Sequence, residues 1–437
     1  MASEITHARV LKIALPIVLA NVTVPILGIV DTGVVGQLGE AAPIAAVGIG
    51  AVILTAFYWA FGFLRMGTTG LTSQALGAGD TLEVQALLLR ALAIGFVAGA
   101  AIIALQVWLF AGAFAVSPAS AEVESLAREY MAIRVWSAPA LIGLYGVGGW
   151  LIAQERTRAL LAVQLVMNGA NIILDLIFVL QFNWGVPGVA WATFIAEWSG
   201  LALGLWLCRD GFAGLGPAVT SRVLDRVKLR HMAVVNGDIM IRSLLLQSIF
   251  ISFLFFAARF GDVQLAANHI LLQFLNITAM ALDGFALGAE SLVGQALGAR
   301  SRAKLRRAVI VTSGWGMAIA LALSALFAIF GNMIIGVMTT AQDVRAAAAT
   351  FLPYMVVSPF LGAASWMLDG IFIGATRTAD MRNMMAVSAA VYFATVLPLM
   401  TLFGNHGLWL GMLISFIVRG ATLACKYPAL EAEADKP

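Results

Sequence analysis

Seven acidic residues lie inside stretches of sequence that are otherwise hydrophobic. An ionised side chain at the centre of a bilayer costs at least ~2.5 kcal/mol on the insertion scale, so each carboxyl group there needs a reason. The same stretches hold few basic residues: Arg65, Arg134, Arg242 and Arg419. This surplus of carboxylates favours binding of protons, metal ions or organic cations over anions. The acidic residues are Asp31, Asp175, Glu197, Asp238, Asp283, Glu290 and Asp369.

In the first half of the chain, four polar residues are expected to gather near one membrane face. Asn168, Asn171 and Asp175 are spaced i, i+3 and i+7, which places them on one face of a helix. Asp31 lies late in the first hydrophobic stretch, at a similar predicted depth. We therefore expect Asp31 and Asp175 to share a site, the alternative being a structural polar contact for each.

Thr193 and Glu197 could border the same pocket, because their i, i+4 spacing places them on one helical face. A structural contact is the equally weighted alternative. Pro16 and Pro25 remove backbone N–H groups from the helix that carries Asp31 and can bend it. A bendable helix with a carboxylate could couple protonation to a change of shape.

The second half carries a longer polar pattern. His269, Asn276, Asp283 and Glu290 recur every seven residues, and a heptad drifts only ~20° around a helix, so they form one stripe. At ~1.5 Å per residue the stripe covers about the thickness of the hydrocarbon core. It cannot face lipid, so it lines a wet cavity or a helix interface. Asp369 could face this region.

Asp238 and Arg242 are also spaced i, i+4, and we interpret them as a structural ion pair. The alternative is a role for Asp238 in binding.

The elements that must position these residues are membrane helices. Of the 437 residues, 61% are hydrophobic and 11% are charged, against roughly 25% charged in soluble domains. The mean hydropathy is +0.94. The sequence therefore predicts an all-α polytopic membrane protein with about twelve transmembrane helices. Membrane lipids are its expected surroundings, and a nucleic-acid partner is not expected.

The chain repeats itself at a constant offset of 221 residues. The segment Gln74-Ala-Leu-Gly-Ala78 recurs as Gln295-Ala-Leu-Gly-Ala299, and Gly67 matches Gly288. An even number of helices per half makes the repeats parallel. We predict two six-helix lobes: an N-lobe over 1–208, a cytoplasmic connection over 209–232, a C-lobe over 233–425 and a cytoplasmic tail over 426–437.

The carboxylates do not follow the repeat. At the same offset Asp31 corresponds to Ser252, and Asp175 corresponds to Val396. The scaffold is duplicated while the acidic residues are not, which indicates different tasks for the two lobes.

Basic residues predict the orientation. With the N-terminus inside, the outer connections hold only Arg128, Arg259 and Arg345, and the other basic residues of the connections lie inside. Both termini are therefore expected in the cytoplasm and the chain in an inner membrane. Cys208 and Cys425 are expected to be free thiols.

Enzyme signatures are not found in the sequence. The histidines at positions 7, 231, 269 and 406 are scattered, so no metal site or catalytic relay is evident. No phosphate-binding loop of the G-x-x-x-x-G-K-[ST] type occurs. We expect a protein that is not an enzyme and that carries no cofactor and no metal.

An ordered set of short segments resembles the multidrug and toxic compound extrusion family, specifically its DinF-like branch, over nearly the whole chain. The segments are Ala14-Leu-Pro16, Val30-Asp-Thr32, Gln74-Ala-Leu-Gly-Ala78, Asn171-Ile-Ile-Leu-Asp175, Ala192-Thr-Phe-Ile-Ala-Glu197, Asn236-Gly-Asp-Ile-Met-Ile-Arg242, Asp283-Gly-Phe-Ala286 with Glu290, and Asp369-Gly-Ile-Phe-Ile-Gly-Ala-Thr-Arg377.

The resemblance implies an antiporter that exports amphipathic, often cationic compounds in exchange for H⁺ or Na⁺. It implies that Asp31, Asn171 and Asp175 surround the proton or cation site, with Thr193 as a neighbouring hydroxyl. The residues Thr193, Glu197, Asn276, Asp283, Glu290 and Asp369 are our candidates for a substrate site or a second ion site.

The ion is expected to be H⁺, with Na⁺ as the alternative, and the transporter is expected to be a monomer. The runner-up function is a lipid-linked precursor flippase of the same superfamily. Such proteins have cationic cavities for anionic headgroups, so the acidic surplus in this sequence argues against it.

Overall fold

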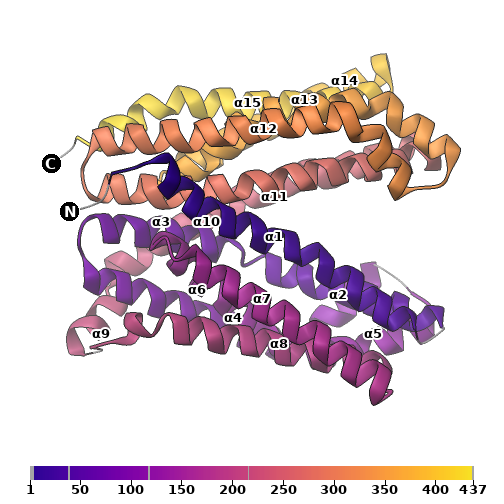
Figure 1. The fold of residues 1–437 in the computed structure, drawn as a ribbon, viewed down its shortest axis with the longest axis horizontal. Helices are drawn as coiled ribbons and strands as arrows, with labels where there is room; N and C mark the ends of the chain where they lie inside the picture. The colour runs from indigo at the N-terminus through magenta and orange to yellow at the C-terminus, as the bar shows by residue number, and fades with distance from the viewer. Residues whose placement is uncertain (1–3, 38–39, 117–118, 215, 436–437) are drawn as a thin grey trace. The chain divides into compact units, whose positions relative to one another are not determined.

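The computed structural model describes residues 4–37, 40–116, 119–214 and 216–435. Within these ranges every regular element is a helix, and twelve helical segments are long and apolar enough to span a membrane (Figure 1). Helices satisfy their own backbone hydrogen bonds, which lipid requires. The predicted all-α fold is confirmed.

Some of the twelve spans are divided by short irregular turns. The second span consists of α2 and α3, the fourth of α5 and α6 joined by a 3₁₀ turn at Val135–Ser137, and the fifth of α7 and a π-helical turn at Leu176–Gln181. The helices in order are α1 (His7–Gly36), α2 (Ala41–Trp59), α3 (Phe63–Gly77), α4 (Thr81–Val116), α5 (Ala121–Arg134), α6 (Ala138–Ala153), α7 (Thr157–Asp175), α8 (Gly185–Leu207), α9 (Pro217–Val223), α10 (Arg226–Ala257), α11 (Asp262–Gly298), α12 (Arg302–Met338), α13 (Gln342–Gly374), α14 (Thr378–Phe403) and α15 (Asn405–Glu433).

The helices form two compact units, each made of separate stretches of the chain. The first unit comprises Met1–Val18, Ser73–Gly79 and His231–Pro437, and the second comprises Leu19–Thr72 and Asp80–Arg230. In the first unit α11 packs against α12 and α13, and α15 packs against α13 and α14. In the second unit α4 packs on α6, α7 on α8, and α5 on α2 and α8. The predicted lobe boundaries at 208 and 233 stay a prediction.

A buried arginine binds the segment that connects the two halves of the sequence. Arg90 of α4 donates to Glu83 Oε1 at 2.7 Å and to the backbone carbonyl oxygen of Val223 at 3.1 Å. It also donates to the carbonyl oxygen of Arg222. These two carbonyl groups belong to the end of α9, where helical carbonyls lack partners within the helix. Arg90 thus fixes α9 against α4.

The repeated segments meet at a backbone-to-backbone crossing within the first unit. A methyl group on Gly77 would lie 2.1 Å from the carbonyl oxygen of Gln295, and one on Gly298 would lie 2.0 Å from the carbonyl oxygen of Gln74. Neither carbonyl can move without disturbing its helix. Glycine is therefore required at the same position of both repeats.

Gly77→Ala and Gly298→Ala are each expected to destabilise the protein by about 1–3 kcal/mol, the usual cost of overpacking. Thermal unfolding in detergent should show a lower midpoint for both variants. Gly112→Ala is the matched control, because no atom lies within 4 Å of its added methyl group. An unchanged midpoint in both crossing variants would contradict the close approach.

Candidate functional site

The predicted polar face of α7 lies in the interior of the second unit. Asn168, Asn171 and Asp175 are all buried, and Asp175 is 0% exposed. Asn168 Nδ2 donates to Thr23 Oγ1 of α1 at 2.9 Å, which ties the two helices together. Asp175 is the last residue of α7 before the π-helical turn. Such turns occur frequently at functional sites.

Asp31 of α1 lies beside this face. The carboxyl groups of Asp31 and Asp175 are within hydrogen-bonding reach of each other. Asp175 Oδ1 is buried and has no hydrogen-bond donor among the described residues. Two carboxylates can share a hydrogen bond only if one of them carries a proton. The arrangement therefore has a place for one proton between the two side chains.

The side-chain amide of Asn171 connects Asp31 to α8. In one orientation Nδ2 donates to Thr193 Oγ1 at 3.0 Å. In the other orientation Nδ2 donates to Asp31 Oδ1 at 3.1 Å, and Oδ1 accepts from Thr193 Oγ1 at 3.0 Å. The structure thus brings together Asp31, Asn171, Asp175 and Thr193.

Glu197 lies in the same unit and has a cationic partner. Arg134 of α5 donates to Glu197 Oε1 at 2.5 Å and to the hydroxyl group of Tyr130 at 2.8 Å, and all three side chains are buried. The charge of Arg134 also acts on Asp31 and Asp175. This cluster, in which Asp31 is half-buried and the others are buried, therefore combines three carboxyl groups with one guanidinium group.

Asp238 and Arg242 take other partners than the predicted ion pair. Asp238 accepts from Arg382 Nη1 at 2.5 Å and from Thr378 Oγ1 at 3.0 Å. Arg242 forms its ion pair with Asp369. An i, i+4 pair within a helix gains only about 0.2–0.5 kcal/mol. Contacts between α10, α13 and α14 decide the pairing instead.

Asp369, a candidate for the substrate or second ion site, is compensated by two guanidinium groups. Besides Arg242, Arg419 of α15 approaches Asp369 Oδ2 to 3.8 Å and donates to Ser365 Oγ at 2.8 Å. All four side chains are buried. Asp238 and Asp369 are thus each neutralised by at least one arginine.

The heptad stripe of α11 changes its surroundings along the helix. His269 and Asn276 are exposed within the described structure, and Asn276 Nδ2 donates to Gln273 Oε1 at 3.1 Å. Asp283 is half-buried, and Glu290 is only 3% exposed. One end of the stripe is therefore open and the other lies within helix packing.

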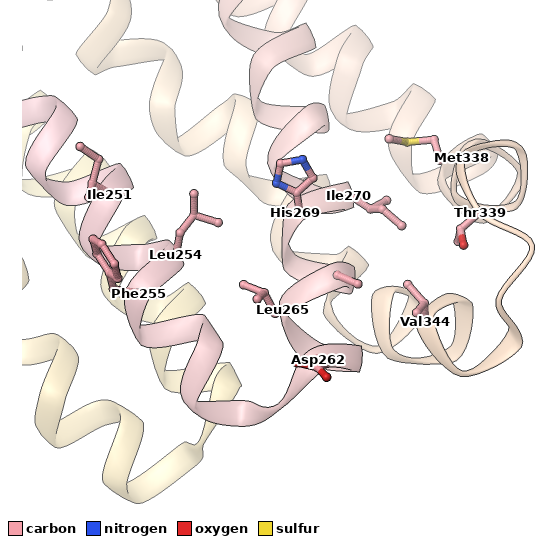
Figure 2. A pocket seen from close by; sticks show the side chains of 11 residues that line it. Ile251, Leu254, Phe255, Asp262, Leu265, His269, Ile270, Met338, Thr339 and Val344 are labelled. Atoms are coloured by element: carbon pink, nitrogen blue, oxygen red, sulfur yellow. The ribbon is translucent and has the colours of Figure 1, made fainter. Parts of the chain in front are cut away.

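His269 also lies in a pocket of about 770 Å³. Figure 2 shows it on α11 between Leu254 and Phe255 on one side and Met338 and Val344 on the other. Most of the lining side chains are apolar, and Asp262, His269 and Thr339 are the polar ones. Such a pocket suits an amphipathic molecule.

The stripe predicts graded reactivity of introduced cysteines. In a background without the native cysteines, Asn276→Cys should react with a charged thiol reagent roughly tenfold faster than Glu290→Cys, because exposure controls thiol reactivity. Asp283→Cys should be intermediate. Leu282→Cys is the buried control, since Leu282 is 0% exposed. Equal protection at 276, 283 and 290 would make a helix interface the better account of the whole stripe.

Sequence reasoning missed the partners that come from other helices. Tyr130 is one turn from Arg134 and could have been found by its i, i+4 spacing. Tyr58 of α2, which donates to the carbonyl oxygen of Arg134 at 3.1 Å, gave no local signal. Neither did Arg382, the partner of Asp238.

Comparison with known proteins agrees with this architecture. The MatE family model matches residues 16–177 and 239–402. DNA damage-inducible protein F of Escherichia coli (strain K12) is 38% identical over 418 residues, covering 94% of this chain and 90% of that protein. A probable multidrug resistance protein NorM of Bradyrhizobium diazoefficiens is 26% identical, covering 96% and 92%.

Among solved structures, the bent form of the Vibrio cholerae MATE transporter VcmN matches with a TM-score of 0.88 and 21% identity, covering 98% of each chain. The fold is therefore shared over the full length. The sequence matches also confirm the predicted resemblance and identify a transporter, not an enzyme. The chain belongs to the MatE family of multidrug and toxic compound extrusion transporters.

Proposed function

We propose that this transporter is a secondary active antiporter that exports amphipathic organic cations in exchange for H⁺ by alternating access. The observation that carries the proposal is the pair formed by Asp31, which is half-buried, and Asp175, which is buried. Their carboxyl groups are within hydrogen-bonding reach, and Asp175 Oδ1 has no donor among the described residues. A proton on one of the two carboxyl groups allows them to share a hydrogen bond. No cofactor is needed.

Competition for the carboxylates makes the exchange obligatory. With one proton bound, the cluster of Asp31, Asp175, Glu197 and Arg134 holds two carboxylate charges and one cationic charge. Release of the proton adds a buried negative charge, which costs free energy unless a cation compensates it. An organic cation supplies that compensation, so proton release and substrate binding favour each other.

Asn171 is the group that responds to the proton. When Asp31 is ionised, the amide nitrogen donates to it, as the 3.1 Å orientation allows. Protonation of Asp31 removes the negative charge that strengthens this hydrogen bond. Protonation thus weakens the contact of Asn171 with α1, which carries Pro16 and Pro25.

The pocket around His269 supports an amphipathic substrate. Its apolar lining accommodates the hydrophobic body of such a molecule. The negative charge of the exposed Asp262 carboxylate would attract a cation. The alternative substrate, an anionic lipid-linked precursor, would need an uncompensated cationic surface. The buried cluster around Asp31 has more carboxyl groups than guanidinium groups, which disfavours that alternative.

The test is efflux from proteoliposomes with each ion gradient imposed separately. A pH gradient alone should drive export of a fluorescent organic cation by the purified protein, and a Na⁺ gradient at equal pH should not. One pH unit is worth ~1.4 kcal/mol per proton exchanged. Export driven only by a Na⁺ gradient would show that Na⁺ is the exchanged ion. If the protein exported neither the organic cation nor a lipid, the antiport proposal would be wrong.

The proposed orientation in a bacterial inner membrane can be tested with single cysteines. Ser221→Cys, in the connection, should react with an impermeant maleimide only after permeabilisation, and Glu122→Cys should react in intact cells. Cys425 is exposed and must be replaced first. Burial raises the pKa of the Cys208 thiol to about 12, so at pH 8 it stays protonated and unreactive. Labelling of position 221 in intact cells would show that the topology is the opposite of the proposed one.

A further inference from the structure

A second pocket in the Leu19–Thr72 and Asp80–Arg230 unit is built from aromatic rings. It has a volume of about 350 Å³ and lies between α5, the 3₁₀ turn that follows it, and α8. No residue of the proposed proton site lines it. The lining residues are Ala132, Ile133, Trp136, Trp191, Phe194 and Trp198.

The rings are fixed against one another. Trp191 and Phe194 meet edge to face with centroids 5.4 Å apart, and Phe194 and Trp198 are 6.4 Å apart. Trp198 Nε1 donates to the backbone carbonyl oxygen of Trp136 at 3.2 Å, which joins α8 to the 3₁₀ turn. Trp136 and Trp191 remain 54% and 42% exposed, so the pocket is open.

The depth of these residues is unusual for tryptophan. Tryptophan side chains usually anchor a membrane protein at the two interfaces. Trp136 lies near the middle of the span Ala121–Ala153, and Trp198 lies near the middle of the span Gly185–Leu207. Interface anchoring therefore does not explain either of them.

The chemistry of the pocket suits a cation. The faces of aromatic rings attract cations, and aromatic cages are the known recognition device for quaternary ammonium groups. Two lining residues are adjacent in sequence to a buried ion pair, because Ile133 precedes Arg134 and Trp198 follows Glu197.

We propose that the pocket formed by Trp136, Trp191, Phe194 and Trp198 binds the quaternary ammonium group of lipophilic organic cations within the membrane. The ligand class rests on the proposed export of organic cations, and the pocket adds a binding site for them on the side of the unit. A lipid acyl chain is the competing occupant. It would use the apolar surface of the rings and gain nothing from their charge distribution.

The test is equilibrium binding of radiolabelled benzyltrimethylammonium to the detergent-purified full chain without an ion gradient. The Asp31→Asn background removes competition from the proton site. In that background Trp191→Leu should weaken binding about two- to fivefold, the range expected for one cation–π contact. Trp191→Leu with Trp198→Leu should weaken it about tenfold.

Two controls separate the outcomes. Trp206→Leu, on the same helix but outside the pocket, should leave affinity unchanged, and Trp191→Phe should restore much of the loss. Unfolding midpoints show whether the variant with Trp198→Leu still folds. If that variant does not fold, the binding measurement on Trp191→Leu alone tests the proposal. Unchanged affinity in folded Trp191→Leu overturns the proposal and favours an acyl chain. Since no gradient is applied, this result is independent of whether proton-driven efflux succeeds.

Discussion

Asp31→Asn is expected to abolish export driven by a pH gradient while the protein still folds and inserts. Asparagine keeps the size and polarity of the side chain but cannot carry the exchanged proton. Two pH units support a roughly 100-fold concentration ratio of substrate per proton exchanged. In the variant this ratio should fall to about one, the value expected without coupling. Proteoliposomes with an imposed pH gradient provide the measurement.

Asp175→Asn should behave nearly the same, because the two carboxyl groups share the proton. Asp343→Asn is the matched control, since this exposed carboxylate lies outside both the proton site and the His269 pocket. It should leave the dependence on the pH gradient intact. Full gradient-driven export by Asp31→Asn would exclude the proposed mechanism.

The second large effect concerns the ion pair of Arg134 and Glu197. Arg134→Met leaves Glu197 buried without its cationic partner, and breaking a buried ion pair from one side typically costs about 3–5 kcal/mol. We expect a strongly lowered unfolding midpoint and reduced expression. Tyr130 also loses the hydrogen bond that Arg134 donates to its hydroxyl group.

The double variant Arg134→Met with Glu197→Leu should recover most of that stability, because no uncompensated charge remains. A double-mutant cycle on unfolding midpoints measures the difference. If the loss of stability in the double variant equals the sum of the two single losses, the two residues do not act as a unit. Recovery of stability with retained proton coupling would show that Glu197 is structural.

The membrane fold could be predicted from the sequence because lipid leaves few solutions. Runs of about 20 apolar residues can only be spanning helices. The repeat of Gln74-Ala-Leu-Gly-Ala78 at Gln295 correctly marked two related segments, and the structure adds that they cross at Gly77 and Gly298. That crossing depends on tertiary packing and has no local signal.

The candidate site was partly predictable from helical spacing. Asn168, Asn171 and Asp175 share one helical face by spacing alone, and the structure buries all three. Spacing failed for Asp238 and Arg242, because their strongest partners come from other helices. Helical periodicity reports which residues share a face, but it does not report which neighbouring helix the face meets.

The aromatic pocket was beyond sequence reasoning. Trp191 near a helix end is readily interpreted as an interface anchor. The pocket exists because a 3₁₀ turn at Val135–Ser137 places Trp136 beside Trp198 of α8. Neither the turn nor the pairing of the two spans follows from the tryptophan positions.

Proton release on substrate binding tests the central claim most directly. Purified Trp191→Leu protein, in which the aromatic pocket is weakened, is titrated in weakly buffered solution with benzyltrimethylammonium or another exported cation while a pH-sensitive dye reports the proton. Competition for the pair Asp31 and Asp175 predicts release of about one proton per cation bound, by the reciprocity of linked binding. Asp31→Asn should release none. Saturable cation binding by the Trp191→Leu protein without proton release would contradict proton exchange at this site.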